Sequence, residues 1–226
     1  ERDQYVEYQN YIKETKLGIN ADIAGYGKTN SMLGLMIRDK MEWNCDMPYT
    51  TEKISTESQG LIKNRIIERY IRLPCNLVLV TPSLLSQWES EITRTNLNWV
   101  SITKKKDIDH TRVEEYDVVF ILNTIYNNLI KSWHNYAWKR FIFDEPGHVR
   151  VSGMKEIKAG FYWFVTATPN QITLHHQNCR GSFIKNILGE NILTFEEQFQ
   201  GMIIKNSEDF VKLSFQMPPT YWHQYR

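Results

Sequence analysis

Four short apolar segments restrict the folds that this chain can adopt. They are "NLVLVTP" at 76–82, "YDVVFIL" at 116–122, "RFIFDE" at 140–145 and "FYWFVTAT" at 161–168. Each is almost continuously apolar, as expected for a strand in a sheet that helices cover on both faces. They indicate a mostly parallel sheet, and a first strand is expected near 17–21.

Amphipathic helical patterns lie between these segments. Residues 29–41 space Met32, Leu33 and Met36 as on one face of a helix, and residues 83–93 repeat the pattern. Strand and helix in alternation predict an α/β domain, with helices on both faces of the sheet and right-handed crossovers.

Two parts of the chain depart from this alternation. Residues 42–72 are polar and irregular and then helical in pattern at "LIKNRIIERYIRL", so we interpret them as an insertion. The end, "VKLSFQMPPTYWHQYR" from 211, is typical of a short strand that breaks at its two prolines and leads into a connection. We therefore expect one lobe over 1–213 and a linker over 214–226.

Composition sets the remaining limits. A chain of 226 residues with 42% hydrophobic content can bury the core of one large domain. Its longest apolar runs are too short to cross a bilayer and its start lacks a signal-peptide core, so we expect a soluble protein with no membrane partner. Three widely spaced cysteines fit neither a disulfide framework nor a zinc site and favour reduced thiols in an intracellular compartment.

The overall charge does not point to nucleic acid. The formal net charge is +1, and the only cluster of basic residues is the lysine triplet at 104–106. A run of three lysines is more often a solvated loop than a binding patch. Any nucleic-acid function must therefore be argued from motifs.

Polar residues follow each predicted strand. In parallel sheets the loops at the carboxyl ends of the strands meet in one crevice, where ligands bind. The residues expected there are 25–29, 81–83, 123–124, 144–145 and 166–168.

The segment "NADIAGYGKTN" at 20–30 has two possible interpretations. It is either a loop that cradles phosphate or a glycine turn before an exposed lysine, because the strict phosphate-loop pattern has glycine where Asp22 stands. In a cradle, backbone N–H groups and the following helix N-terminus face the phosphates. Lys28 then reaches the β and γ phosphates, and Thr29 offers its hydroxyl to Mg²⁺.

The adjacent carboxylates of Asp144 and Glu145 end another apolar strand. Burying an unpaired charge is costly, so they need a cation or water. In a phosphate-loop ATPase the first acid holds Mg²⁺ and the second orients or deprotonates the attacking water. The alternative is an acid pair that faces solvent. Thr166 and Thr168 offer hydroxyls nearby, although they also suit a strand that simply ends before a proline.

Five motifs taken in order resemble the first RecA-like lobe of superfamily two helicases. They are "ADIAGYGKT", "LVLVTPSLLSQWESEI", "DVVFILNT", "WKRFIFDEPGH" and "FYWFVTATPNQ". The similarity is greatest to the Snf-type chromatin-remodeller translocases, including divergent relatives in large DNA viruses. That family shows "ADExGxGKT", with an acid at the position of Asp22, which favours the phosphate cradle. "MPPTYW" resembles the passage to a second lobe.

The resemblance implies a phosphate-loop NTPase fold and a set of site residues. Lys28, Asp144 and Glu145 would be catalytic, and Thr29 and Asp144 would hold Mg²⁺. ATP would contact the loop and a glutamine before it: Gly25, Tyr26, Gly27, Lys28, Thr29, Asn30 and Gln9. Nucleic acid would contact Ser83, Gln87, Trp88, Asn123 and Thr124. Thr166, Thr168 and His148 would couple the two sites, although the family has its histidine one position before His148.

Three functions compete at this point. The first is the ATP-binding lobe of a translocase that closes on a second RecA-like lobe and tracks duplex DNA, with RNA as the other possible substrate. The second is a non-catalytic lobe that serves as a structural component of a larger transcription, remodelling or virion complex. The third, a small-molecule kinase, lacks a recognisable acceptor site. The compartment would be the nucleus, or the host cytoplasm or virion for a viral protein.

Overall fold

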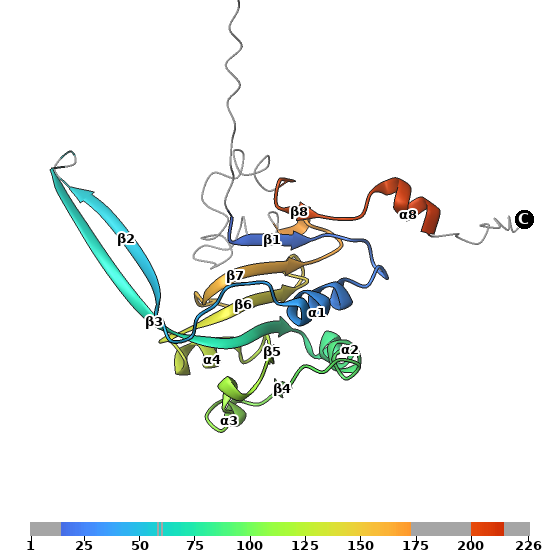
Figure 1. Cartoon of the computed structure of the whole chain (residues 1–226), viewed down its shortest axis with the longest axis horizontal. Helices are drawn as coiled ribbons and strands as arrows, with labels where there is room; N and C mark the ends of the chain where they lie inside the picture. Colours follow the sequence, from blue (N-terminus) through green and yellow to red (C-terminus); the bar gives the residue numbers. More distant parts are fainter. Residues whose placement is uncertain (1–14, 58, 60, 173–199, 215–226) are drawn as a thin grey trace, which may run out of the picture.

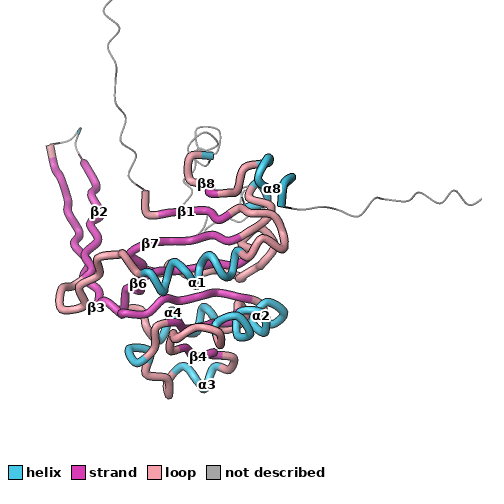
Figure 2. The backbone as a smooth tube through the Cα atoms, turned by 45° about the vertical axis from the view of Figure 1, so that its right-hand side comes forward, coloured by secondary structure: helices cyan, strands magenta, loops and turns pink. Residues whose placement is uncertain are grey.

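In the described part of the chain, seven strands run parallel in one sheet (Figure 1). The computed structural model describes residues 15–57, 59, 61–172 and 200–214. The strand order is β4-β5-β3-β6-β7-β1-β8, which can be followed from the bottom to the top of Figure 2. These strands are β1 (Leu17–Asn20), β3 (Ile62–Val80), β4 (Trp99–Ile102), β5 (Val118–Leu122), β6 (Tyr136–Asp144), β7 (Lys158–Val165) and β8 (Ile203–Ile204). The predicted mostly parallel α/β fold is confirmed.

Helices and loops cover both faces of this sheet. The helices with described bounds are α1 (Lys28–Arg38), α2 (Pro82–Ile92), α3 (Lys105–Ile108), α4 (Tyr126–Ser132) and α8 (Glu208–Ser214), with a short 3₁₀ turn at Val113–Glu115. Val78 and Val80 pack with the buried residues of α1 and α2. Leu77 and Leu79, which alternate with them, pack with α4 on the other face. Two-sided burial explains why the central strands are continuously apolar.

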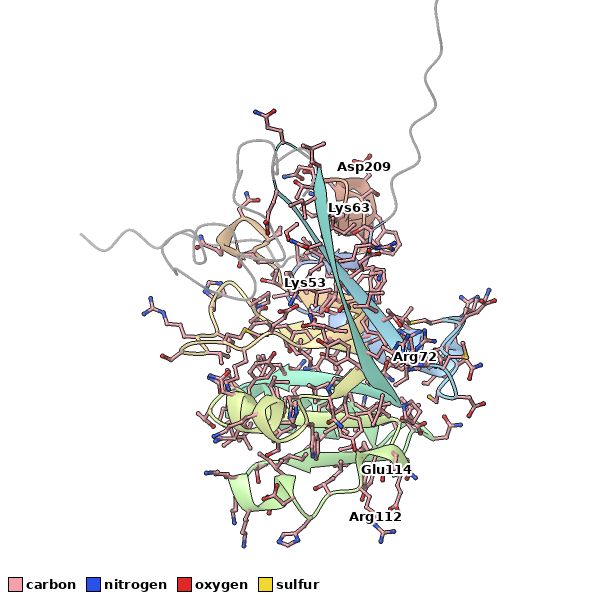
Figure 3. All side chains as sticks on the ribbon, turned by 90° about the vertical axis from the view of Figure 1, so that its left-hand side faces the viewer. Lys53, Lys63, Arg72, Arg112, Glu114 and Asp209 are labelled. Atoms are coloured by element: carbon pink, nitrogen blue, oxygen red, sulfur yellow. The ribbon has the colours of Figure 1, made fainter. Side chains whose placement is uncertain are left out.

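A long hairpin replaces the helix expected from "LIKNRIIERYIRL". β2 (Tyr49–Glu57) pairs antiparallel with the first half of β3, from Tyr49 opposite Tyr70 to Glu57 opposite Ile62. This hairpin, which we call the arm, projects away from the carboxyl ends of the strands in Figure 1. Lys53 and Lys63 lie along it and Arg72 lies near its base in Figure 3. The helical prediction was wrong because cross-strand pairing and β-branched isoleucines outweigh a helical spacing of the apolar residues.

Smaller differences appear at the ends of elements. Helix α1 stops at Arg38 rather than at Met41, because Asp39 takes a positive φ of 28°. A strand was expected from residue 211 onward, but residues 211–214 belong to helix α8. The rest of the expected strand lies outside the described residues. In the described part of the chain no helix is both long and apolar enough to cross a bilayer.

A buried charge network ties the end of α1 to the middle of β6. The Arg140 guanidinium donates to Asp39 at 2.8 Å and to the Asn76 side chain at 3.2 Å, and Lys139 also pairs with Asp39. The Arg140 side chain is only 4% exposed. Burial raises the pKa of Asp39, but hydrogen bonds from Lys139 and Arg140 outweigh it and lower that pKa below its ordinary value. The network therefore favours the ionised carboxylate.

Replacing Asp39 by asparagine should leave the buried Arg140 without its anionic partner. We expect a loss of about 2 kcal/mol in the free energy of unfolding at pH 7, measured by urea denaturation. The pKa of Asp39 is lower in the folded state than its ordinary value of 3.8. The stability that the Asp39 carboxylate contributes is therefore present above pH 3.8 and is lost as the pH falls through the folded pKa. Asp109→Asn, an exposed control, should change stability by less than about 0.5 kcal/mol. Equal effects of the two substitutions would contradict the network's role.

Candidate nucleotide site

The carboxyl ends of β1, β7 and β6 lie side by side on one rim of the sheet. Val165 at the end of β7 pairs with Asn20 of β1 on one side and with Asp144 of β6 on the other. The chain segments that follow these three strands carry Lys28, Glu145 and Thr166. Register alone therefore brings together three motifs that are far apart in the sequence.

The glycine loop, residues 21–27, connects β1 to α1. Gly25 and Gly27 have φ values of 83° and 69°, a left-handed conformation that favours glycine at both positions. Gly27 is the N-cap of α1 and provides no side-chain cap hydrogen bond to the first turn of this helix. Such a turn presents backbone N–H groups and the positive end of the helix dipole to an anion.

Lys28 is folded back onto its own loop. Its ammonium group donates to the backbone oxygens of Asp22 at 3.0 Å and Ile23 at 3.3 Å. Thr29, which follows it, is buried. Tyr26 donates its hydroxyl to the carbonyl of Val211 at 3.1 Å, and Asn30 is exposed on the first turn of α1. A bound anion would have to draw the Lys28 ammonium away from these carbonyls.

Asp144 is a buried carboxylate with an unusual partner. It is 6% exposed, and the indole N–H of Trp88 donates to its Oδ2 at 2.7 Å. Burial raises the pKa of Asp144 to about 6. The Trp88 hydrogen bond opposes this rise, the neighbouring Glu145 charge adds to it, and the positive charge of Lys28 opposes it. The influence of Lys28 shows that its ammonium lies within electrostatic range of the acid pair.

Glu145 begins a hydrogen-bonded series that we call the threonine relay: Glu145, Thr166, Thr168 and His148. The Thr166 hydroxyl donates to Glu145 Oε2 at 2.6 Å, and the Thr168 backbone N–H donates to the Thr166 hydroxyl at 3.1 Å. The His148 ring nitrogen Nε2 lies 3.0 Å from the Thr168 hydroxyl. The displaced histidine therefore still reaches the second threonine.

The turn after the acid pair explains how His148 reaches that position. Glu145 has a φ of 53°, and its carbonyl accepts from the N–H groups of His148 and Val149, both at 2.9 Å. A Cβ on Gly147 would lie 2.8 Å from the Cβ of Gln171 and close to its backbone. Glycine at 147 thus permits the turn to pack against the segment after Thr168. The sequence analysis did not assign this role to Gly147, because the neighbour is a tertiary one.

The residues predicted to contact nucleic acid divide into two groups. Ser83, Gln87 and Thr124 are exposed near the same rim, and Asn123 is half-buried. Trp88 is fully buried, so its predicted contact with nucleic acid is corrected: its indole binds Asp144 instead. A buried indole N–H requires an acceptor, and this requirement could have indicated the pairing. Gln9 lies outside the described residues.

The site offers ligands suited to Mg²⁺. No cluster of three or more histidine, cysteine, aspartate or glutamate side chains that could hold a metal by itself occurs in the described ranges. Magnesium commonly takes one or two protein oxygens together with water and phosphate oxygens. The Asp144 carboxylate and the Thr29 hydroxyl fit that smaller donor set.

The buried Asp144 charge should destabilise the fold in a pH-dependent way. The pKa of Asp144 in the folded protein is about 6, above its ordinary value of 3.8. The stability that the protonated carboxyl contributes is therefore fully present below pH 3.8 and is lost as the pH rises through about 6. Asp144→Asn removes the charge and keeps an acceptor for Trp88. We expect this variant to gain up to about 3 kcal/mol at pH 8 in urea unfolding, a gain that disappears by about pH 4. An exposed control, Asp46→Asn, should show neither effect, and a pH-independent gain would contradict the assignment.

Comparisons with known proteins identify the family. A profile of the SNF2-related domain matches residues 6–220. The putative helicase R592 of Acanthamoeba polyphaga mimivirus is 22% identical over 93% of this chain and 31% of its own length. The DNA repair protein RAD5 of Gibberella zeae is 27% identical over 67% of this chain and 16% of its own. The chain thus spans less than a third of either relative.

A solved structure shows the same fold. The Sulfolobus solfataricus SWI2/SNF2 ATPase core, determined in complex with dsDNA, matches with a TM-score of 0.53 and 19% identity, over 84% of this chain and 40% of that one. The likeness agrees with a RecA-like sheet flanked by helices. Because the family profile extends over nearly the whole sequence, the chain belongs to the SNF2-related domain family.

Proposed function

We propose that this chain is the ATP-binding lobe of a nucleic-acid-dependent ATPase that couples hydrolysis to movement along duplex DNA. The observation that carries the proposal is the arrangement of Lys28, Asp144 and Glu145 on one rim, within electrostatic range of one another. A glycine turn with an exposed lysine would not require a buried Asp144 and a half-buried Glu145 beside it. Membership of the SNF2-related family supports ATP as the nucleotide.

Each residue of the site has a distinct role in this proposal. Lys28 exchanges the carbonyls of Asp22 and Ile23 for the β and γ phosphates. Asp144 and Thr29 would hold Mg²⁺, which would neutralise charge on the phosphate oxygens. Glu145 orients the attacking water and accepts its proton. Thr166 fixes one Glu145 oxygen, which leaves the other oxygen for that water.

The threonine relay continues toward the residues predicted to contact nucleic acid. His148 is followed by a loop whose Arg150 carbonyl accepts from the side-chain amide of Asn123 at 3.2 Å. Asn127 donates to the carbonyl of Ser152 in the same loop at 2.7 Å. A change at Glu145 on loss of the γ phosphate can therefore pass to Asn123 along this series of contacts.

A second lobe is part of the proposal. Arginine fingers in related ATPases raise the rate by several orders of magnitude, and among the described residues no arginine hydrogen-bonds or ion-pairs with Asp144 or Glu145. The relatives are more than three times as long as the region matched, which is compatible with a second RecA-like lobe. Duplex DNA is favoured because the structural neighbour was determined with dsDNA. Contacts to phosphate through hydroxyl and N–H groups are compatible with a near-neutral lobe.

Lys28→Ala and Glu145→Gln should separate binding from chemistry. We expect Lys28→Ala to weaken ATP binding, and Glu145→Gln to bind ATP while lowering duplex-stimulated hydrolysis at least about 100-fold. Both are measured as ATP turnover with and without duplex DNA, in a protein that carries this lobe with the second RecA-like lobe. The exposed Lys106→Ala serves as the control. A rate that no nucleic acid changes would refute the translocase function, and absence of ATP binding would favour the structural-component alternative.

His148→Ala should uncouple the two sites without removing the acids. Because the His148 side chain contacts Thr168 and not the acid pair, we expect basal ATP turnover within about twofold and a loss of about 3- to 30-fold in stimulation by duplex DNA. His134→Ala, on an exposed turn away from this rim, is the matched control. Equal loss of basal and stimulated turnover would assign His148 to the chemical step instead.

A further inference from the structure

The arm leaves apolar surface uncovered. It is a two-stranded hairpin that projects from the sheet (Figure 1), and β2 pairs with no strand other than β3 in the described part of the chain. More than half of the large apolar side chains that are exposed among the described residues lie on it: Ile54, Leu61, Ile62, Ile66, Ile67 and Ile71. Two strands by themselves are marginally stable in water, and exposed apolar clusters mark interaction sites. The arm is therefore a candidate docking element.

The pairing of β2 with β3 sorts the arm residues onto two faces. Residues directly opposite each other share a face, and successive residues of one strand alternate between the faces. One face, which we call the basic face, consists of four cross-strand pairs and Ile71: Thr50–Arg69, Glu52–Ile67, Ile54–Arg65 and Thr56–Lys63. Each of these residues is exposed, so the whole face is open to a partner.

The basic face carries a net positive charge. Lys63, Arg65 and Arg69 are positive and Glu52 is negative, which gives a formal charge of +2. Arg65 pairs with Glu52, whereas Lys63 and Arg69 form no ion pair with any described residue. The opposite face of the arm carries one lysine and two glutamates, a formal charge of −1. An acidic partner is therefore favoured on the basic face alone.

A hollow of about 300 Å³ lies at the base of the basic face. Arg69 and Ile71 of that face line the hollow, together with Met47 and Pro48 from the segment before β2. Met47 is itself exposed. The hollow therefore extends the face with further apolar surface, and its volume is sufficient for a large side chain of a partner.

Arg72 gives the hollow a second guanidinium group. This group lies over the Trp43 ring, 4.7 Å from its centroid, and its Nη1 donates to the Asn44 carbonyl at 3.2 Å. Its Nε is buried without a hydrogen-bond partner, and no described carboxylate forms an ion pair with it. The lining contains one acid, Asp46, so with Arg69 and Arg72 its formal charge is +1. Guanidinium groups are well suited to bind carboxylates.

Two other occupants fit the basic face less well. Nucleic acid is contacted mainly at phosphate and sugar, and it would gain little from Ile54, Ile67 and Ile71, which are 52–54% exposed. The arm also projects away from the rim where the residues predicted to contact nucleic acid lie (Figure 1). A second copy of the chain that used the same face would bring two positive surfaces together, which is unfavourable.

We infer that the basic face and the hollow form a docking site for an acidic and apolar segment of a partner polypeptide. Apolar side chains of the partner cover Ile67 and Ile71, and its carboxylates pair with Lys63, Arg69 and Arg72. Residues of β3 that share this face are two positions apart, about 6.6 Å. Extended chains that pack face to face stay within about 30° of each other, so an extended partner segment can match this spacing with every second residue.

The test titrates a labelled peptide with this chain and measures fluorescence anisotropy. In the peptide, glutamate and valine alternate along one side of the extended chain, with threonine at the intervening positions. We expect a Kd of about 0.1 mM or tighter, and binding at least about tenfold weaker when glutamine replaces glutamate. Arg69→Glu and Ile67→Thr should each weaken binding of the glutamate peptide about tenfold. Both side chains are exposed, so both variants should keep the fold.

Two matched controls separate the basic face from the rest of the surface. Ile66→Thr changes an exposed isoleucine on the opposite face of the same strand, and Lys105→Glu reverses an exposed charge on α3. Each should leave the peptide affinity within about twofold. Equal effects of Ile66→Thr and Ile67→Thr, or of Lys105→Glu and Arg69→Glu, would overturn the inference.

Cys45 reports where the peptide lies, because it is exposed and lines the hollow. Its alkylation by iodoacetamide, followed by mass spectrometry, should slow at least about threefold with the glutamate peptide and not with the glutamine peptide. An unchanged rate at saturating peptide would remove the hollow from the site. Failure of the glutamate peptide to bind would overturn the inference. If a short labelled duplex DNA then bound and Arg69→Glu abolished that binding, the face would belong to nucleic acid instead.

Discussion

Parallel pairing in one register is the constraint on which the rest of this structure depends. Because β6, β7 and β1 run in the same direction and their ends pair through Val165, every segment that follows a strand emerges on the same rim. Short loops then suffice to bring a lysine, two carboxylates and two threonines together. The burial of both sheet faces holds this register, since a slip of one residue would turn apolar side chains out of the two cores.

The rim carries a cost in stability at Asp144. A carboxylate with 6% exposure is an unfavourable choice for a core, and its raised pKa is the measure of that cost. Trp88 offsets part of it through the indole N–H, and the Lys28 charge offsets a further part. A buried negative charge that the protein compensates only in part is typical of a cation site, because a bound cation would compensate the rest.

Two sets of contacts connect this site to other parts of the molecule. The threonine relay leads from Glu145 to His148 and on to the loop that Asn123 holds. On the other side, Asp22 and Tyr26 fasten the glycine loop to the segment 205–211. The acid pair and the glycine loop are therefore each fastened to a different part of the molecule. The arm lies apart from these contacts, on the side of the sheet away from the rim (Figure 1).

Local patterns in the sequence determined the fold class, the strands in the apolar segments, helices α1 and α2, and the residues of the glycine loop and acid pair. These depend on side-chain periodicity and on the backbone freedom of glycine, which are properties of neighbouring residues. The tertiary structure alone decided the arm, the Trp88–Asp144 hydrogen bond, the close approach of Gly147 to Gln171, and the hydrogen bonds from Asn206 to Asp22. Each of these is a pairing between residues far apart in the chain. Its energy comes from a partner elsewhere in the chain, so the sequence of one segment does not identify that partner.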